Sequence, residues 1–158
     1  MAIATIGSEC ISLERRQQIV TRIENNLYVD EWENPTVRLR NATESAIGGI
    51  LDAATAGAVW RVLPVRAASP YCFLGGREFP VNSRLISGVL SHCDRAVVCA
   101  ATLGESVDEL IADPGHSAYD RYIFDHVASV VMETVMDELE ILLAKQLPQS
   151  LGMTARYS

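Results

Sequence analysis

Apolar and polar residues follow a helical period in several parts of this chain, most clearly between Ser117 and Pro148. Apolar side chains recur there every four residues, which predicts one long helix with a buried stripe. Ser117 and Asp120 have the spacing of a capping box at its start, and Pro148 is expected to close it. The stripe consists of Ile123, Val127, Val131, Val135, Leu139 and Leu143. A second, polar row offset by two positions consists of Asp125, Ser129, Glu133 and Asp137.

Shorter helices are predicted over residues 12–27, over about 42–56, and after Asn82, which is a plausible N-cap. The pair Gly48-Gly49 weakens the second of these helices. Close packing against a neighbouring element is the ordinary explanation for small residues at such a place. The positions expected to face the core in the helix after Asn82 are Leu85, Ile86, Val89 and Leu90.

Strand patterns occupy the middle of the chain. Residues 59–65 are rich in β-branched and aromatic side chains, and Pro64 predicts that this strand lies at an edge or that the strand ends there. Residues 71–81 predict a hairpin that turns at Gly75-Gly76.

The run from Ala96 to Ala101 is wholly apolar and shows no polar alternation. Such a run, stopped by a glycine turn, is typical of a strand buried on both faces, so we expect it at the centre of the sheet. A short helix is predicted after Thr102-Leu103-Gly104, ending near Asp113.

This order of elements predicts one α+β domain, in which a small, mainly antiparallel sheet packs with helices that include a long C-terminal one. The 158 residues, of which 49% are hydrophobic, suffice for a single core. The formal net charge of −7 argues against nucleic acid or an anionic membrane as partner. No apolar stretch is long enough to span a bilayer, and a cytoplasmic location is expected.

Residue chemistry alone predicts no catalytic residue and no metal site. The cysteines Cys10, Cys72, Cys93 and Cys99 contain no C-x-x-C pair, and Cys99 is expected to be a small core residue. The three histidines lack metal-ligand spacing. The turn at Gly104 precedes a helix, but Glu105 and Asp108 make it a poor phosphate site and suit the helix dipole without a ligand.

Several segments together resemble the activation domain of vitamin B12-dependent methionine synthase and its short stand-alone relatives. They are a helix-then-buried-strand unit at 82–90 and 93–98, a signature turn around Ala101-Thr102-Leu103-Gly104, the long helix at 119–143, and residues 151–158. The resemblance covers about residues 40 to 158. It implies an N-terminal helix-and-loop extension over 1–40 and an activation-like domain over 41–158, cut at its C-terminal end.

The resemblance implies a module that binds S-adenosylmethionine and supports reductive methylation of cobalamin carried by a partner domain or protein. A flavodoxin-type protein is the implied reductant. The module's task is to position the methyl donor, while the cobalt carries the difficult chemistry. Such a module is not expected to be catalytic by itself.

Two ligand-binding residues follow from the resemblance. Arg156 falls where the family has the arginine of an Arg-x-x-x-Gly-Tyr motif, and its guanidinium suits the carboxylate of the methionyl group. Glu133 falls where the family has a glutamate near the ligand, although a solvated helix face explains it equally well. The chain stops at Ser158, before the Gly-Tyr half of the motif.

Two alternatives to the donor-binding module stay open. One is a non-enzymatic domain that docks on a corrinoid protein and has lost donor binding. The other is an unrelated small-molecule enzyme on a similar fold, since a fold does not fix a function.

Overall fold

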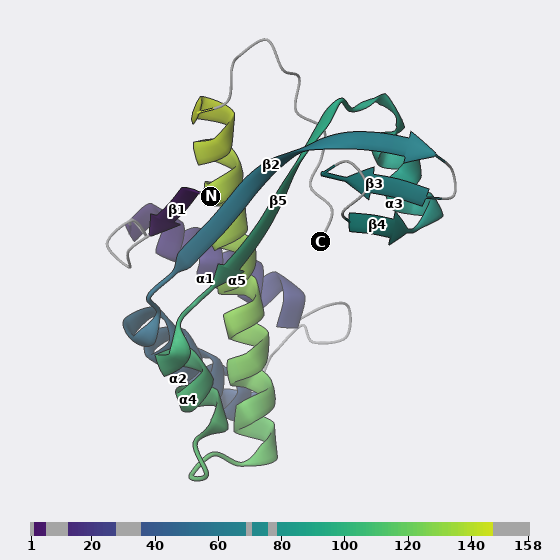
Figure 1. Cartoon of the computed structure of the whole chain (residues 1–158). Coiled ribbons are helices and arrows are strands. Elements are labelled where there is room, and N and C mark those ends of the chain that lie inside the picture. The colour runs from purple at the N-terminus through teal and green to yellow at the C-terminus, as the bar shows by residue number, and fades with distance from the viewer. Residues whose placement is uncertain (1, 6–12, 28–35, 69–70, 76–78, 147–158) are drawn as a thin grey trace. The chain divides into compact units, whose positions relative to one another are not determined.

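The computed structural model describes residues 2–5, 13–27, 36–68, 71–75 and 79–146. They form an α+β fold, as predicted, with a mainly antiparallel sheet and one long C-terminal helix (Figure 1). No helix in these ranges is both long and apolar enough to cross a membrane.

The chain divides into two compact units. The helical unit comprises Ala4–Ala58 and Ala101–Pro148, and the sheet unit comprises Met1–Ile3, Val59–Ala100 and Gln149–Ser158.

The helix α5 (Ala118–Gln146) is contacted by the three other helices described in the helical unit: α1 (Leu13–Leu27), α2 (Val37–Ala53) and α4 (Glu105–Ala112). The whole predicted stripe from Ile123 to Leu143 is buried, with no member more than 4% exposed. Each such side chain contributes about 1.5–3 kcal/mol by leaving water. A second set on the same helix is also buried, because its neighbours enclose more than one face: Phe124, Ala128 and Val130.

The predicted capping box begins α5. The backbone N–H of Asp120 donates to Ser117 Oγ at 3.2 Å, and the backbone N–H of Ser117 donates to Asp120 Oδ2 at 3.1 Å. These reciprocal bonds satisfy donors that a helix start otherwise leaves without partners.

The helices α1 (Leu13–Leu27) and α2 (Val37–Ala53) pack against α5. The first matches its predicted range. The second begins earlier than expected, because Thr36 caps it by accepting a hydrogen bond from the N–H of Leu39 at 3.2 Å. The boundary expected between residues 40 and 41 falls inside α2.

Close packing explains one glycine of the pair in α2. A Cβ at Gly49 would lie 3.2 Å from Leu110 Cδ2 and 3.3 Å from Phe124 Cε1, whereas one at Gly48 would meet nothing within 4 Å. Leu110 belongs to α4 (Glu105–Ala112), so Gly49 lets α2 approach both α4 and α5.

The strand β2 (Gly57–Ala68) lies at the centre of the sheet. It pairs with β1 (Ala2–Thr5), β3 (Tyr71–Leu74) and β5 (Arg95–Thr102), and β3 pairs in turn with β4 (Phe79–Asn82). The predicted hairpin is confirmed, since β3 and β4 are antiparallel. Their connection is longer than a two-glycine turn, and Gly76 lies outside the described residues.

The expectation that Pro64 marks an edge strand or the end of its strand is wrong, because β2 has partners on both sides and continues to Ala68. Pro64 is tolerated because it lies opposite Gly75, where β3 has ended. Its carbonyl accepts from the Gly75 N–H at 3.0 Å, and only the return bond of that last pair is missing.

The expectation that β5 is buried on both faces at the centre of the sheet is also wrong. No residue of β5 is buried, and Val98 is 44% exposed. The strand pairs with β2 alone among the described strands, so it forms an edge. The apolar sequence of this strand is therefore not a sign that its side chains are buried. Cys99 is accordingly half-buried instead of a core residue, whereas Cys72 in β3 is fully buried.

The helix α3 (Arg84–Val89) and the 3-10 helix η2 (Leu90–His92) follow β4. Ser83 rather than Asn82 is the N-cap, accepting from the Ile86 N–H at 3.3 Å. The four apolar positions predicted to face the core are half-buried or exposed, and Leu85 is 61% exposed. In this short helix only Ser87 is fully buried. Its hydroxyl donates a hydrogen bond to the Tyr71 carbonyl at 3.2 Å.

Candidate functional site

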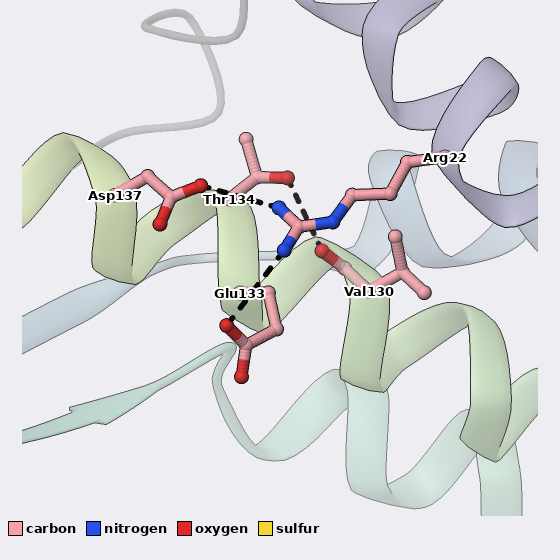
Figure 2. A network of polar contacts seen from close by, with 5 residues as sticks. All are labelled: Arg22, Val130, Glu133, Thr134 and Asp137. Atoms are coloured by element: carbon pink, nitrogen blue, oxygen red, sulfur yellow. Dashed lines mark hydrogen bonds and ion pairs between the residues drawn. The ribbon is translucent and has the colours of Figure 1, made fainter. Parts of the chain in front are cut away.

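The predicted site residue Glu133 takes part in a polar cluster between α1 and α5. Figure 2 shows the guanidinium of Arg22, from α1, between the carboxylates of Glu133 and Asp137. Arg22 Nη1 donates to Asp137 Oδ2 at 3.2 Å, and Arg22 Nη2 lies 3.9 Å from Glu133 Oε2. The nearby Thr134 hydroxyl bonds within its own helix, donating to the Val130 carbonyl at 3.1 Å.

Helix geometry brings the two carboxylates together. Glu133 and Asp137 are four residues apart, so they are neighbours on one side of α5, where two like charges repel each other. Arg22 offsets that repulsion. The three side chains are 42–48% exposed, and an ion pair so open to water contributes only about 0–1 kcal/mol.

The carboxylate of Glu133 lies on a half-exposed helix face and is engaged by the Arg22 guanidinium. Its role in binding a ligand stays a prediction.

The sequence pattern placed Glu133 and Asp137 in one polar row but missed their partner. Arg22 is 115 residues away from Asp137 along the chain. The four-residue spacing signals the carboxylate pair, whereas no local signal identifies which arginine faces it.

The second predicted site residue, Arg156, lies outside the described residues. Its convergence with Glu133 on one ligand therefore stays a prediction.

The turn at Gly104 has a structural explanation. Gly104 has φ +98°, a conformation that favours glycine, and a Cβ there would lie 3.2 Å from the carbonyl oxygen of Thr55. The Gly104 N–H donates to Thr102 Oγ1 at 3.0 Å, and the Thr55 N–H donates to the Leu103 carbonyl at 2.7 Å. These bonds close the turn on itself and tie it to the end of α2.

The described cysteines and histidines form no metal-binding group. Burial raises the pKa of the Cys72 thiol, with a smaller contribution from Cys93, so this thiol is disfavoured as a nucleophile. His116 stacks on Phe124 with ring centroids 4.6 Å apart.

Three buried polar atoms lack a hydrogen-bond partner within the described ranges, and all lie in the helical unit. They are Thr43 Oγ1, His116 Nδ1 and His126 Nε2. Sequence patterns gave no sign of them, because burial without a partner is a tertiary property.

No protein-family model and no curated protein matches the sequence.

Proposed function

We propose that this chain is an S-adenosylmethionine-binding module that supports reductive methylation, and hence reactivation, of cobalamin in a corrinoid-dependent methyltransferase of the methionine synthase type. The observation that supports this most is the segment from β5 to α4. A strand, a turn at a left-handed glycine and a helix occur there in the order that the family's Ala-Thr-Leu-Gly segment implies.

The acidic cluster on α5 fits one end of the proposed donor. S-adenosylmethionine carries a positively charged sulfonium and an ammonium group, and the carboxylates of Glu133 and Asp137 are half-exposed. Glu133 would attract these cationic groups, and Arg156 would hold the methionyl carboxylate through a bidentate pair.

The residues act by positioning. The donor supplies the methyl group and the partner's cobalamin accepts it, so this chain has only to fix the donor's orientation. Arg22 keeps the two α5 carboxylates close together, which makes it a positioning residue for Glu133.

Isothermal titration calorimetry of the full chain with S-adenosylmethionine tests the proposal. We expect saturable binding by the wild-type chain. Glu133→Gln and Arg156→Gln should each weaken it about tenfold or more, since each loses a charge-assisted contact worth about 1.5–3 kcal/mol.

Asp125→Asn provides the matched control, because Asp125 is an exposed acid on the same helix. It should bind like the wild-type chain. Absence of binding by the wild-type chain, or equal weakening by Asp125→Asn and Glu133→Gln, would contradict the proposal.

A second candidate is a docking domain for a corrinoid protein without donor binding. The ion pairs of Arg22 with both carboxylates favour this candidate. They already neutralise part of the negative charge that would otherwise attract the cationic groups of a donor. A pull-down with a cobalamin-loaded corrinoid protein separates the two. Capture without any S-adenosylmethionine, combined with a blank titration, supports docking, whereas donor-dependent capture supports the first proposal.

A further inference from the structure

Charge is distributed unevenly between the two units. Over Val59–Ala100, which is most of the sheet unit, the sequence has five arginines, no lysine and two acids, a formal net charge of +3. The whole chain carries −7, so the acids lie mainly in the helical unit. A surface that attracts an acidic partner is therefore expected in the sheet unit.

The register between β2 and β5 follows from contacts near both ends of the pair. The Val65 N–H donates to the Asp94 carbonyl at 2.9 Å. At the other end, a Cβ at Gly57 would lie 3.9 Å from Thr102 Cγ2. Both contacts fit one antiparallel register, in which opposed side chains point to the same face of the sheet.

One face of the sheet brings two arginines together. The register sets Arg95 of β5 opposite Pro64, and Arg66 follows two residues later along β2, on the same face. Arg66 is in turn opposite Phe73 of β3, which lies beside β2 (Figure 1). We call this surface the arginine face, and its members are Val62, Pro64, Arg66, Phe73, Arg95 and Val97.

The arginine face is open to solvent. Arg66 and Arg95 are exposed, and Val62 is 36% exposed. On the opposite face, Leu63 of β2 and Cys72 of β3 are buried. Around these two buried residues, the arginine face is therefore the side of the sheet that a partner can reach.

Arg66 and Arg95 have no counter-charge among the described residues. The Arg66 guanidinium stacks on Phe73, with its carbon 5.5 Å from the ring centroid, and this contact holds it in place. Diagonal neighbours on adjacent strands have Cβ atoms about 7 Å apart, so Arg95 repels Arg66. Neither arginine forms an ion pair within the part of the chain that the structure describes. Carboxylates of a partner would relieve this repulsion and pair with the guanidinium groups.

The composition of the arginine face favours a protein over a nucleic acid as that partner. Four of its six members are apolar, and apolar side chains beside arginine and aromatic anchors are typical of protein interfaces. Interfaces with nucleic acids are more polar and more basic. The net charge of −7 also repels a polyanion at long range.

We propose that the arginine face docks an acidic segment of a partner protein, in which carboxylates flank an apolar side chain. The carboxylates pair with Arg66 and Arg95, and the apolar side chain packs on the neighbouring Val62 and Val97. A face of six residues is small for a protein interface, so the complex is transient. The residues proposed to bind the donor do not belong to this face, so the inference is independent of donor binding.

Fluorescence anisotropy of a labelled peptide with the full chain tests the proposal. The probe is Glu-Glu-Leu-Leu-Glu-Glu, and its matched control has glutamine in place of every glutamate. We expect saturable binding of the acidic peptide that weakens as the salt concentration rises, and much weaker binding of the glutamine peptide. Equal binding of the two peptides, or no binding of the acidic one at millimolar concentration, overturns the inference.

Arginine substitutions locate the binding surface. Arg66→Gln and Arg95→Gln should each weaken binding of the acidic peptide about two- to fivefold, the range of exposed ion pairs, and the double variant should weaken it further. Arg61→Gln is the matched control, because Arg61 is an exposed arginine of β2 on the opposite face, and it should bind like the wild-type chain. Circular dichroism checks that each variant stays folded.

Two outcomes of this series overturn the inference. One is a loss in Arg61→Gln equal to the losses in Arg66→Gln and Arg95→Gln, which would reduce the effect to net charge. The other is a single-stranded oligonucleotide that binds more tightly than the acidic peptide and loses affinity in the same two variants, which would make the face a nucleic-acid surface.

Discussion

The helical unit and the sheet unit are each stabilised by a different kind of interaction. In the helical unit a continuous set of apolar side chains on α5 packs against α1, α2 and α4. In the sheet unit the buried apolar side chains of the described residues are few: Trp60, Leu63 and Cys72. Side-chain packing therefore contributes most of the stability of the helical unit. In the sheet unit, hydrogen bonding between β2 and its partner strands contributes a larger share. We expect the sheet unit to open more readily.

The same substitution made in each unit gives the largest expected effect. Leu139→Ala removes a side chain that is 1% exposed and should cost about 2–5 kcal/mol in the free energy of unfolding. Leu63→Ala in β2 should cost about 2 kcal/mol, at the low end of that range, because fewer buried neighbours surround it. Urea titration measures both. Equal losses would remove the distinction between the units.

The surface of α5 supplies the control for this pair. Ile141 is 47% exposed on the same helix as Leu139. Ile141→Ala should change the free energy of unfolding by less than about 0.5 kcal/mol. A loss comparable to that of Leu139→Ala would show that the burial pattern of α5 is wrong.

The turn at Gly104 should be the next most sensitive position. Gly104→Ala places a Cβ on a backbone with φ +98° and 3.2 Å from the carbonyl oxygen of Thr55, so it should cost about 1–3 kcal/mol. Thermal unfolding followed by circular dichroism checks this. An unchanged melting temperature would mean that the turn is not anchored to the end of α2.

Substitutions of the two adjacent glycines of α2 test helix packing. Their expected effects on stability are smaller and can differ in sign. Gly48→Ala should stabilise the chain by about 0.5–1 kcal/mol, because alanine favours helix and nothing lies within 4 Å of the new Cβ. Gly49→Ala should stabilise the chain less than Gly48→Ala does, or should destabilise it, because Leu110 and Phe124 must move to admit the new Cβ. Urea titration of both variants decides it. A larger gain at Gly49 would contradict the close approach of α2 to α4 and α5.

The cap of α5 should show the smallest effect, visible as a pH dependence. Hydrogen bonds from the Ser117 side chain and backbone hold the pKa of Asp120 below its ordinary value. The stability from this ionised carboxylate is therefore complete above the ordinary value and is lost as the pH falls through the lowered one. Asp120→Asn should have a lower melting temperature at neutral pH and should converge toward the wild-type value in acid.

Asp125→Asn, on the exposed side of the same helix, serves as control for this pH effect. Its melting temperature should follow that of the wild-type chain across the same pH range. A constant difference between Asp120→Asn and the wild-type chain from neutral pH into acid would exclude the carboxylate as its cause.

Local patterns predicted local structure well. The four-residue repeat and the capping box of α5 identified both its start and its buried stripe, because these features depend on neighbours along the chain. The hairpin of β3 and β4 was predictable for the same reason.

Features set by distant neighbours were not predictable. The apolar run of β5 does not reveal how many strands flank it, and Pro64 does not reveal that β3 ends opposite it. The contact of Arg22 with Glu133 and Asp137 depends on how α1 packs on α5. Spacing thus placed Glu133 and Asp137 in one row of α5, but the resemblance alone singled out Glu133, and no local pattern identified their partner.

We propose that the face of α5 bearing Glu133 takes part in holding S-adenosylmethionine, and a nuclear magnetic resonance titration of the isotopically labelled chain with this donor tests the proposal. We expect saturable shifts of the Arg22 guanidinium and Glu133 signals, with the signals of β3 and β4 unchanged. Shifts confined to β3 and β4, or none at donor concentrations of several millimolar, would contradict it.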